Sequence, residues 1–166
     1  DTDLVYVVTD VAGTPTSKGI EKSDLKTAVN PILTAYKTAD ETKVSSTAYG
    51  DDADLVLTLE ANAIYEFSAM IIATSHATPD IRCRFNVPID AVGFYATSVQ
   101  SVANTTNTYA SKLAIAGSGL ATITNLSGTI SSVTGGNINY AWGQNSSDVN
   151  GSTINKGSTI SLKKLN

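Results

Sequence analysis

Charged residues are scarce in this chain of 166 residues: only 16% are Asp, Glu, Lys or Arg, whereas 42% are hydrophobic. Cysteine, histidine and tryptophan occur once each. A single cysteine excludes an internal disulfide. The apolar content is too high for a disordered chain, and the abundance of Thr, Ser, Asn, Gly and Ala is untypical of a cytosolic enzyme.

Basic patches are also missing. The formal net charge is −4 and the pI is about 4.8. Binding to nucleic acid requires clustered Lys and Arg to neutralise phosphates. The adjacent pair Lys163 and Lys164 is interpreted as a solvated strand end. The composition therefore excludes nucleic acid as a partner.

Long apolar runs are absent. The longest, Ala69–Ala73, is far shorter than the ~20 residues that a membrane-spanning helix needs. No charged start followed by an apolar segment indicates a signal peptide. We therefore expect no membrane insertion. Because the chain begins at Asp1 without methionine, we expect it to be processed or to belong to a longer product.

Few residues suit catalysis. His76 lies in a Ser/Thr/Pro turn and is predicted to be exposed, and Cys83 lies in an alternating segment and is predicted to be a buried hydrophobic residue. No Ser/His/Asp arrangement is recognisable. Paired carboxylates alone can hydrolyse glycans, but Glu60 and Glu66 fit solvent-facing strand positions. We predict no catalytic residues, no cofactor and no enzymatic activity.

Two acidic clusters have the oxygen ligands that calcium prefers. One is Asp51-Asp52-Ala53-Asp54, and the other consists of Asn145, Asp148 and Asn150. Neither has the spacing of a calcium-binding loop, and acidic turn residues commonly hydrogen-bond their own backbone. We therefore predict no metal site.

Alternation of apolar and polar residues dominates the chain from about residue 38 onward. Segments with a period of two recur with turn signals every 8–12 residues, which is typical of strands in an all-β domain. About eight or nine strands predict an antiparallel β-sandwich, jelly-roll-like in topology. A propeller would need an internal repeat, and none is found.

The same alternation predicts the core. Inward positions are assigned to Leu57, Leu59, Tyr65, Phe67, Phe85, Phe94, Trp142 and Leu162. Trp142 is interpreted as a core or inter-subunit residue, with a sugar-stacking platform as the alternative. Residues Tyr65–Ala73 and Ile81–Val87 are predicted to be adjacent antiparallel strands joined across the Thr78-Pro79-Asp80 turn.

Residues 1–37 differ from residues 38–166 and are treated as a separate small β/α segment. Leu4–Val8 predicts a strand, Lys18–Ile20 a short second strand, and Ser23 the cap of a helix that Pro31 ends. This segment is too short to enclose its own core, so it needs a partner surface. The candidate docking residues are Val5, Val7, Leu25 and Val29.

Three motifs carry a family resemblance. They are L-x-A-N-x-x-Y-x-F at Leu59–Phe67, W-x-Q-x-x-S-D at Trp142–Asp148 and G-S-x-I-x-L at Gly157–Leu162. Together they resemble an all-β module of bacteriophage virion proteins such as head decorations, head fibres and tail fibres. The polar but uncharged composition also suits β-rich extracellular or virion proteins.

The resemblance implies a non-enzymatic subunit on the exterior of the phage particle. The first 37 residues resemble the attachment segments of phage fibre proteins, so they would dock on a virion protein such as the major capsid protein or a tail component. The sandwich would project outward and assemble as a homotrimer. The resemblance also implies a host surface glycan as a further partner.

Three alternatives stay open at the level of the sequence. A receptor- or glycan-binding tip of a tail fibre would place aromatic residues such as Tyr95, Tyr109 or Tyr140 in a groove. A virion-borne glycan hydrolase would need two carboxylates in a cleft. A bacterial adhesin module would have a secretion signal ahead of Asp1.

Overall fold

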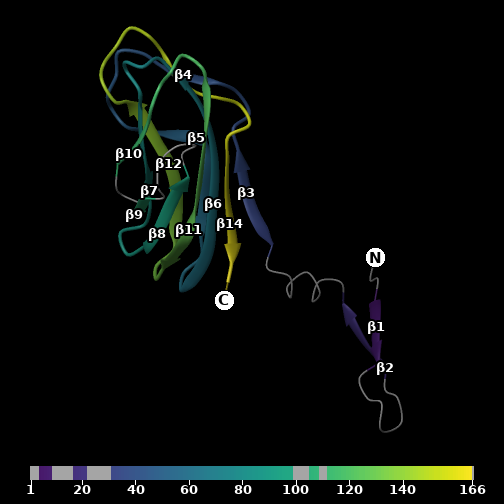
Figure 1. Ribbon diagram of the computed structural model, residues 1–166. Helices are drawn as coiled ribbons and strands as arrows, with labels where there is room; N and C mark the ends of the chain where they lie inside the picture. The colour runs from purple at the N-terminus through teal and green to yellow at the C-terminus, as the bar shows by residue number, and fades with distance from the viewer. Residues whose placement is uncertain (1–3, 9–16, 22–30, 99–104, 109–111, 166) are drawn as a thin grey trace. The chain divides into compact units, whose positions relative to one another are not determined.

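The computed structural model describes residues 4–8, 17–21, 31–98, 105–108 and 112–165 (Figure 1). These residues form strands and turns and contain no helix, and the chain divides into two compact units, Asp1–Pro31 and Ile32–Asn166. Within the described ranges, the search for a helix able to cross a membrane finds none.

The first unit contains a β-hairpin. Strand β1 (Leu4–Val8) pairs antiparallel with β2 (Ser17–Glu21). Both strands expected in this segment are present. The expected helix that starts at Ser23 lies outside the described residues.

The second unit consists of two antiparallel sheets. The larger sheet has the order β3-β14-β6-β11-β8-β9, with β13 pairing with β6 and β4, and the smaller sheet has the order β10-β7-β12-β5. The strands are β3 (Ile32–Tyr36), β4 (Glu41–Lys43), β5 (Gly50–Leu59), β6 (Ala63–Ser75), β7 (Ile81–Asn86), β8 (Val92–Ser98), β9 (Thr105–Thr108), β10 (Leu113–Ile115), β11 (Ala121–Ser132), β12 (Gly136–Gln144), β13 (Ser152–Ile154) and β14 (Thr159–Lys164).

The order of the strands along the chain identifies a jelly roll. Strands β3, β5, β6, β7, β10, β11, β12 and β14 alternate between the sheets, except that β7 and β10 share the smaller one. The resulting four-stranded sets, β3-β14-β6-β11 and β5-β12-β7-β10, match the two sheets of a jelly roll. Strands β8 and β9 extend the larger sheet beyond β11. The predicted antiparallel β-sandwich is confirmed.

The sandwich begins earlier than expected. Strand β3, which was assigned to the attachment segment, pairs with β14 so that Leu33 lies opposite Leu162. Residues 32–36 were expected in the attachment segment, because their short apolar run fits a helix as well as a strand. The tertiary pairing decides in favour of a strand.

The predicted pairing of β6 with β7 is wrong. Strand β6 lies in the larger sheet and β7 in the smaller one, so the turn between them crosses the sandwich. Alternation fixes which residues face the core, but it does not identify the neighbouring strand. Phe67 of β6 and Phe85 of β7 therefore meet across the core, with ring centroids 4.9 Å apart in an edge-to-face arrangement.

The core forms between the two sheets. Of the residues predicted to face inward, those at 1% exposure or less are Leu59, Tyr65, Phe67, Phe85, Trp142 and Leu162. Leu57 is half-buried and packs against this cluster. Burying a large apolar side chain contributes roughly 1.5–3 kcal/mol, so these residues supply much of the stability of the sandwich.

Phe94 does not face the core. It is 60% exposed, whereas Tyr95 beside it is 1% exposed and packs against Phe67 and Phe85. Successive side chains of a strand point to opposite faces, so only one of these adjacent aromatics can face inward. The register of β8 with β11 selects Tyr95.

The first sequence motif marks the tight turn between β5 and β6. Leu59 and Phe67 are core residues, and Asn62 adopts a left-handed conformation with φ of 56°. The backbone N–H of Glu60 donates to the Tyr65 hydroxyl at 3.0 Å. The spacing of the motif therefore reflects a turn closed by its own tyrosine.

The third motif secures the start of β14. Gly157 has φ of 89°, and the fully buried Ser158 hydroxyl accepts from the Ile72 N–H at 2.9 Å. Ile160 and Leu162 then enter the core. The residues of this motif, like those of the first, therefore have a structural role in the fold.

Candidate functional site

The outer face of the larger sheet carries many hydroxyl groups. The strand registers align Thr34, Ser161, Ser68, Ser127 and Ala96 in one row across five strands. Thr34 and Ser161 hydrogen-bond through their hydroxyls at 3.1 Å. Because these side chains are small, they project little from the sheet. Their hydroxyl groups are uncharged hydrogen-bond donors and acceptors.

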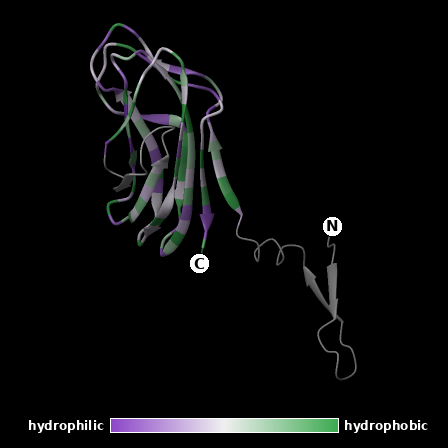
Figure 2. Ribbon diagram, viewed as in Figure 1, coloured by the Kyte–Doolittle hydropathy of each residue, from purple (hydrophilic) through white to green (hydrophobic). Residues whose placement is uncertain are grey.

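Exposed apolar side chains lie on the outer positions of the same sheet. Ile32 and Tyr36 of β3 are 63% and 61% exposed, and Phe94 is 60% exposed. The others are Ile64, Val92 and Ile123. Figure 2 shows the hydrophobic start of β3 beside the hydrophilic end of β14. Large apolar side chains grouped on one face are typical of a contact surface.

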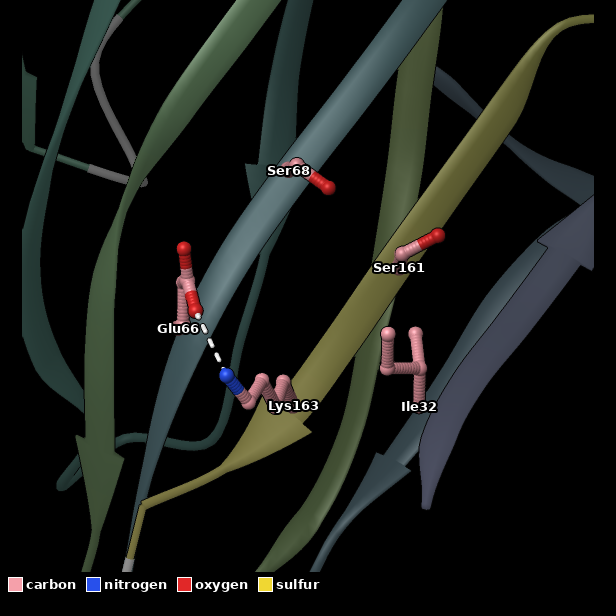
Figure 3. A pocket seen from close by; sticks show the side chains of 5 residues that line it. All are labelled: Ile32, Glu66, Ser68, Ser161 and Lys163. Carbon is pink, nitrogen blue, oxygen red and sulfur yellow. Dashed lines mark ion pairs between the residues drawn. The ribbon is translucent and has the colours of Figure 1, made fainter. Parts of the chain in front are cut away.

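A shallow hollow of about 290 Å³ opens on this face (Figure 3). Its lining consists of Ile32, Glu66, Ser68, Ser161 and Lys163. Glu66 and Lys163 form an ion pair at 3.8 Å, and both side chains are more than half exposed. Such an exposed pair contributes about 0–1 kcal/mol, so it does not rigidify the hollow.

The hollow has the groups of a contact site rather than of a hydrolase. Glycoside hydrolysis needs two carboxyl groups that flank the scissile bond. Of the residues that line the hollow, only Glu66 has a carboxylate, and Lys163 neutralises it. The two serines can donate to and accept from a polar partner.

A buried lysine connects three strands at one end of the sandwich. Lys37, directly after β3, donates to Asp52 of β5 at 2.6 Å and to Glu41 of β4 at 2.9 Å. Burial alone would lower the pKa of Lys37, but its bonds to Asp52 and Glu41 raise that pKa above the usual value. Asp52 also accepts from the backbone N–H groups of Asp54 and Leu55. This cluster is a structural connection.

The aromatic residues considered for sugar stacking are mostly buried. Trp142 is 0% exposed, and the Lys43 ammonium lies 4.2 Å from its ring centroid. Tyr95 and Tyr140 are 1% and 0% exposed, so neither lines a groove. Tyr109 lies outside the described residues. A sugar platform at Trp142 is therefore excluded.

The two residues weighed as nucleophile and base lie in different environments. Cys83 is buried between the sheets, and burial raises the pKa of its thiol to about 12. His76 is exposed in the turn after β6. A thiol with so high a pKa is protonated near neutral pH, so Cys83 is not an active nucleophile there.

The carboxylates of the first acidic cluster have separate partners. Asp51 accepts from Asn86 and Asn139, Asp52 from Lys37, and Asp54 from Thr38. In the second cluster, Asp148 accepts from the backbone and side chain of Asn150. Across the described part of the chain, no three His, Cys, Asp or Glu side chains are placed to hold a metal ion.

The candidate docking residues belong to the first unit. Val5 and Val7 lie on β1, opposite Ile20 and Lys18 of β2. Leu25 and Val29 lie outside the described residues. Their docking role stays a prediction.

Sequence reasoning missed one polar group, formed by Tyr49, Arg82 and Arg84. Both guanidinium carbons lie 4.4 Å from the Tyr49 ring centroid. The signal was present in the alternation, because Arg82 and Arg84 flank Cys83 and must share the face opposite to the core.

Comparisons with known proteins provide no functional assignment. No protein-family model matches the chain, and no curated protein matches it. Chains in structures of infectious bursal disease virus are similar at TM-scores of 0.26 (Gx strain) and 0.24 (Gt strain), with 7% and 8% identity. The match covers 98% and 99% of this chain but 46% and 43% of theirs. This likeness is too weak to support an argument about function.

Proposed function

We propose that this chain is a non-enzymatic structural subunit on the exterior of a bacteriophage particle, either a capsid decoration protein or a fibre subunit. The observation that carries the proposal is a jelly roll whose larger sheet has an open face of hydroxyl groups and apolar side chains. Jelly rolls occur in viral capsid proteins but also in lectins and cupins, so the fold alone does not decide. The resemblance of the three motifs to phage virion proteins favours the virion role.

The subunit associates with copies of itself as a homotrimer. Ile32, Tyr36 and Phe94 are each at least 60% exposed, and burying such side chains between copies removes them from water. Strands β3 and β9 are the ends of the larger sheet and offer unpaired backbone groups. The number three follows from the family resemblance.

The first unit attaches the subunit to the particle. A two-stranded hairpin is marginally stable by itself, so β1 and β2 need a surface to pack on. A major capsid protein or a tail component would supply this surface and cover Val5 and Val7. The sandwich would contribute bulk, shielding or host contact.

Localisation on the particle tests the virion assignment. Antibodies raised against the chain should label the exterior of purified intact particles in electron micrographs, and the chain should copurify with particles through a density gradient. An antibody against an internal protein of the particle is the control. Particles that lack the chain, or labelling only after disruption, would contradict the proposal.

Self-association is tested separately. Light scattering coupled to size exclusion should give three times the chain mass for the full chain at micromolar concentration. Phe94→Asp with Tyr36→Asp should shift the population toward monomer, because charges are costly in an apolar interface. Ser146→Asp with Ser147→Asp, which adds the same charge at exposed loop positions away from this face, is the matched control. A wild-type monomer, or equal dissociation by both pairs, would contradict the proposed interface.

A further inference from the structure

The only two arginines of the chain lie together on one face of the smaller sheet. Arg82 and Arg84 are two positions apart on β7, and the core residues Ile81, Cys83 and Phe85 take the alternate positions. Both guanidinium groups therefore lie on the outer face. Guanidinium is always charged at physiological pH and matches carboxylates with a planar fork of donors.

The Tyr49 ring packs against the guanidinium groups of both arginines. Its ring centroid lies 4.4 Å from the guanidinium carbon of each. Stacking on an aromatic ring fixes the plane of a guanidinium group while leaving its edge available for hydrogen bonds. The site is therefore ordered before a ligand arrives.

The loop that carries Tyr49 is itself anchored. The completely buried Gln144 accepts from the Ser46 N–H at 3.1 Å, and its own backbone N–H donates to the Ser46 carbonyl at 3.0 Å. Gly143 allows the loop to approach, because a Cβ at that position would lie 2.4 Å from the Ala48 carbonyl oxygen. The second sequence motif, Trp142–Asp148, thus serves to position Tyr49.

Among the described residues, neither arginine has an anionic partner. In the described part of the chain, neither guanidinium forms a hydrogen bond or an ion pair, and each Nε is buried without an acceptor. Charged donors are normally paired when partly buried. Two adjacent unpaired guanidinium groups in a chain of net charge −4 point to an external anion.

The neighbours of the arginines along the sheet are small residues, and polar groups lie beside them. On either side along the sheet lie Ala114 and Gly143 beside Arg82, and Ala141 beside Arg84. The exposed Asp51 lies next to Ala141 on β5 and accepts from Asn86 at 2.6 Å and from Asn139 at 3.3 Å. The cationic pair is thus continuous with a row of amides and one carboxylate.

We propose that Arg82, Arg84 and Tyr49 form a binding site for an acidic sugar, a uronic-acid residue of a surface polysaccharide. The sugar carboxylate would be bound by the guanidinium edges, and its hydroxyls would bond with Asn86, Asn139 and Asp51. An acidic peptide fits less well, because a peptide of Asp or Glu has no hydroxyl groups to bond with Asn86, Asn139 and Asp51. This site goes beyond the proposed virion role and rests on different residues from the outer face of the larger sheet.

Calorimetric titration of the full chain tests the site. The probes are an oligogalacturonate, a neutral galactose oligomer of the same length and a poly-glutamate peptide of the same charge. We expect binding of the oligogalacturonate alone, weakening as salt is added. Absence of binding, or equal binding of either other probe, would overturn the proposal whether or not the virion role holds.

Variants locate the binding. Arg82→Gln with Arg84→Gln should weaken oligogalacturonate binding at least about tenfold, because two charge-assisted forks are lost. Lys156→Gln with Lys163→Gln removes the same amount of charge at other positions. It should change the affinity less than about twofold, because dissolved salt screens the interaction between a bound anion and distant exposed charges. Equal losses in the two pairs, or none in the arginine pair, would overturn the assignment.

Two further variants separate the site from the fold. Arg82→Lys with Arg84→Lys keeps the positive charge and the aliphatic part of each side chain but removes the planar guanidinium groups. Tyr49→Ala keeps both guanidinium groups but removes the aromatic ring on which they stack. Each should bind several-fold more weakly while melting within a few degrees of the wild type. An affinity that is unchanged in both of these variants would contradict a site made of two guanidinium groups stacked on Tyr49.

Discussion

Trp142 is completely enclosed between the sheets, with the Lys43 ammonium over its ring. Trp142→Ala should lower the free energy of unfolding by about 3–5 kcal/mol, because it leaves a cavity in the core. Urea denaturation measures the loss. Phe94→Ala, at an exposed position, should cost under about 1 kcal/mol in the monomer. An unchanged stability of Trp142→Ala would contradict the packing described.

Cys83 makes the stability of the sandwich sensitive to alkaline pH. Its folded-state pKa is raised to about 12 from an ordinary value of 9.0. Between those values the unfolded chain loses the thiol proton while the folded chain keeps it, so stability falls as pH rises. Cys83→Ala should show a shallower decline of unfolding free energy from pH 9 to 11 in urea titrations under reducing conditions.

The neutral range provides the control for this prediction. The cysteine variant and the wild type should have parallel pH profiles from pH 6 to 8, where the thiol is protonated in both states. Buried Tyr95 and Tyr140 also have raised pKa values, mainly because of burial, which Cys83→Ala leaves in place. Parallel profiles up to pH 11 would show that Cys83 does not contribute.

At the scale of elements, Asp52 connects β5 to the end of β3 through Lys37. Asp52→Ala should cost about 3–5 kcal/mol of unfolding free energy, because it leaves a buried ammonium group without its nearest counterion. Glu41→Ala, which removes the more exposed partner, should cost about 1 kcal/mol or less. The pair Lys37→Met with Asp52→Leu should recover most of the loss, and equal costs for all three would contradict this account.

The approach of the Tyr49 loop to β12 depends on Gly143. Gly143→Ala should destabilise by about 1–3 kcal/mol and increase hydrogen exchange in residues 44–49, because the new methyl group meets the Ala48 carbonyl oxygen. Gly50→Ala meets only the end of the flexible Lys43 side chain and should be tolerated. Exchange that is unaltered by Gly143→Ala would contradict the role given to this glycine.

The alternation of side chains between the two faces of a strand explains which features of each strand the sequence predicts. Alternation identifies the inward residues Phe67 and Phe85 because their neighbours are polar. It fails at β8, where Phe94 and Tyr95 are both aromatic, and pairing with β11 has to decide. It also cannot choose between a hairpin and a crossover after β6, because that choice depends on the whole strand order.

The candidate sites were less accessible from the sequence. Arg82 and Arg84 are predictable as an outward pair, but Tyr49 reaches them through a loop whose path is set by Gln144, which lies 98 positions beyond Ser46 of that loop. The hollow beside Ile32 depends on a strand that the sequence assigned to another segment. Both sites combine residues distant in sequence, and a local pattern does not contain such information.

For the whole molecule, the division into two units predicts that the sandwich folds without residues 1–31. The deletion should keep a β-sheet circular dichroism spectrum and melt cooperatively within a few degrees of the full chain, because the core lies within the second unit. It should no longer bind to particles when added to a preparation stripped of the protein. Normal occupancy by the truncated chain would place attachment in the sandwich.

The antiparallel pairing of β3 with β14 has a practical consequence. Ile32 lies opposite Lys163, so the chain enters and leaves the sandwich at the same end (Figure 1). The connections of residues 76–80, 116–120 and 145–151 lie at the other end. A label or foreign peptide inserted there would be displayed at the end of the sandwich opposite to Ile32 and Lys163, whereas a C-terminal tag would follow the end at which the chain enters the sandwich.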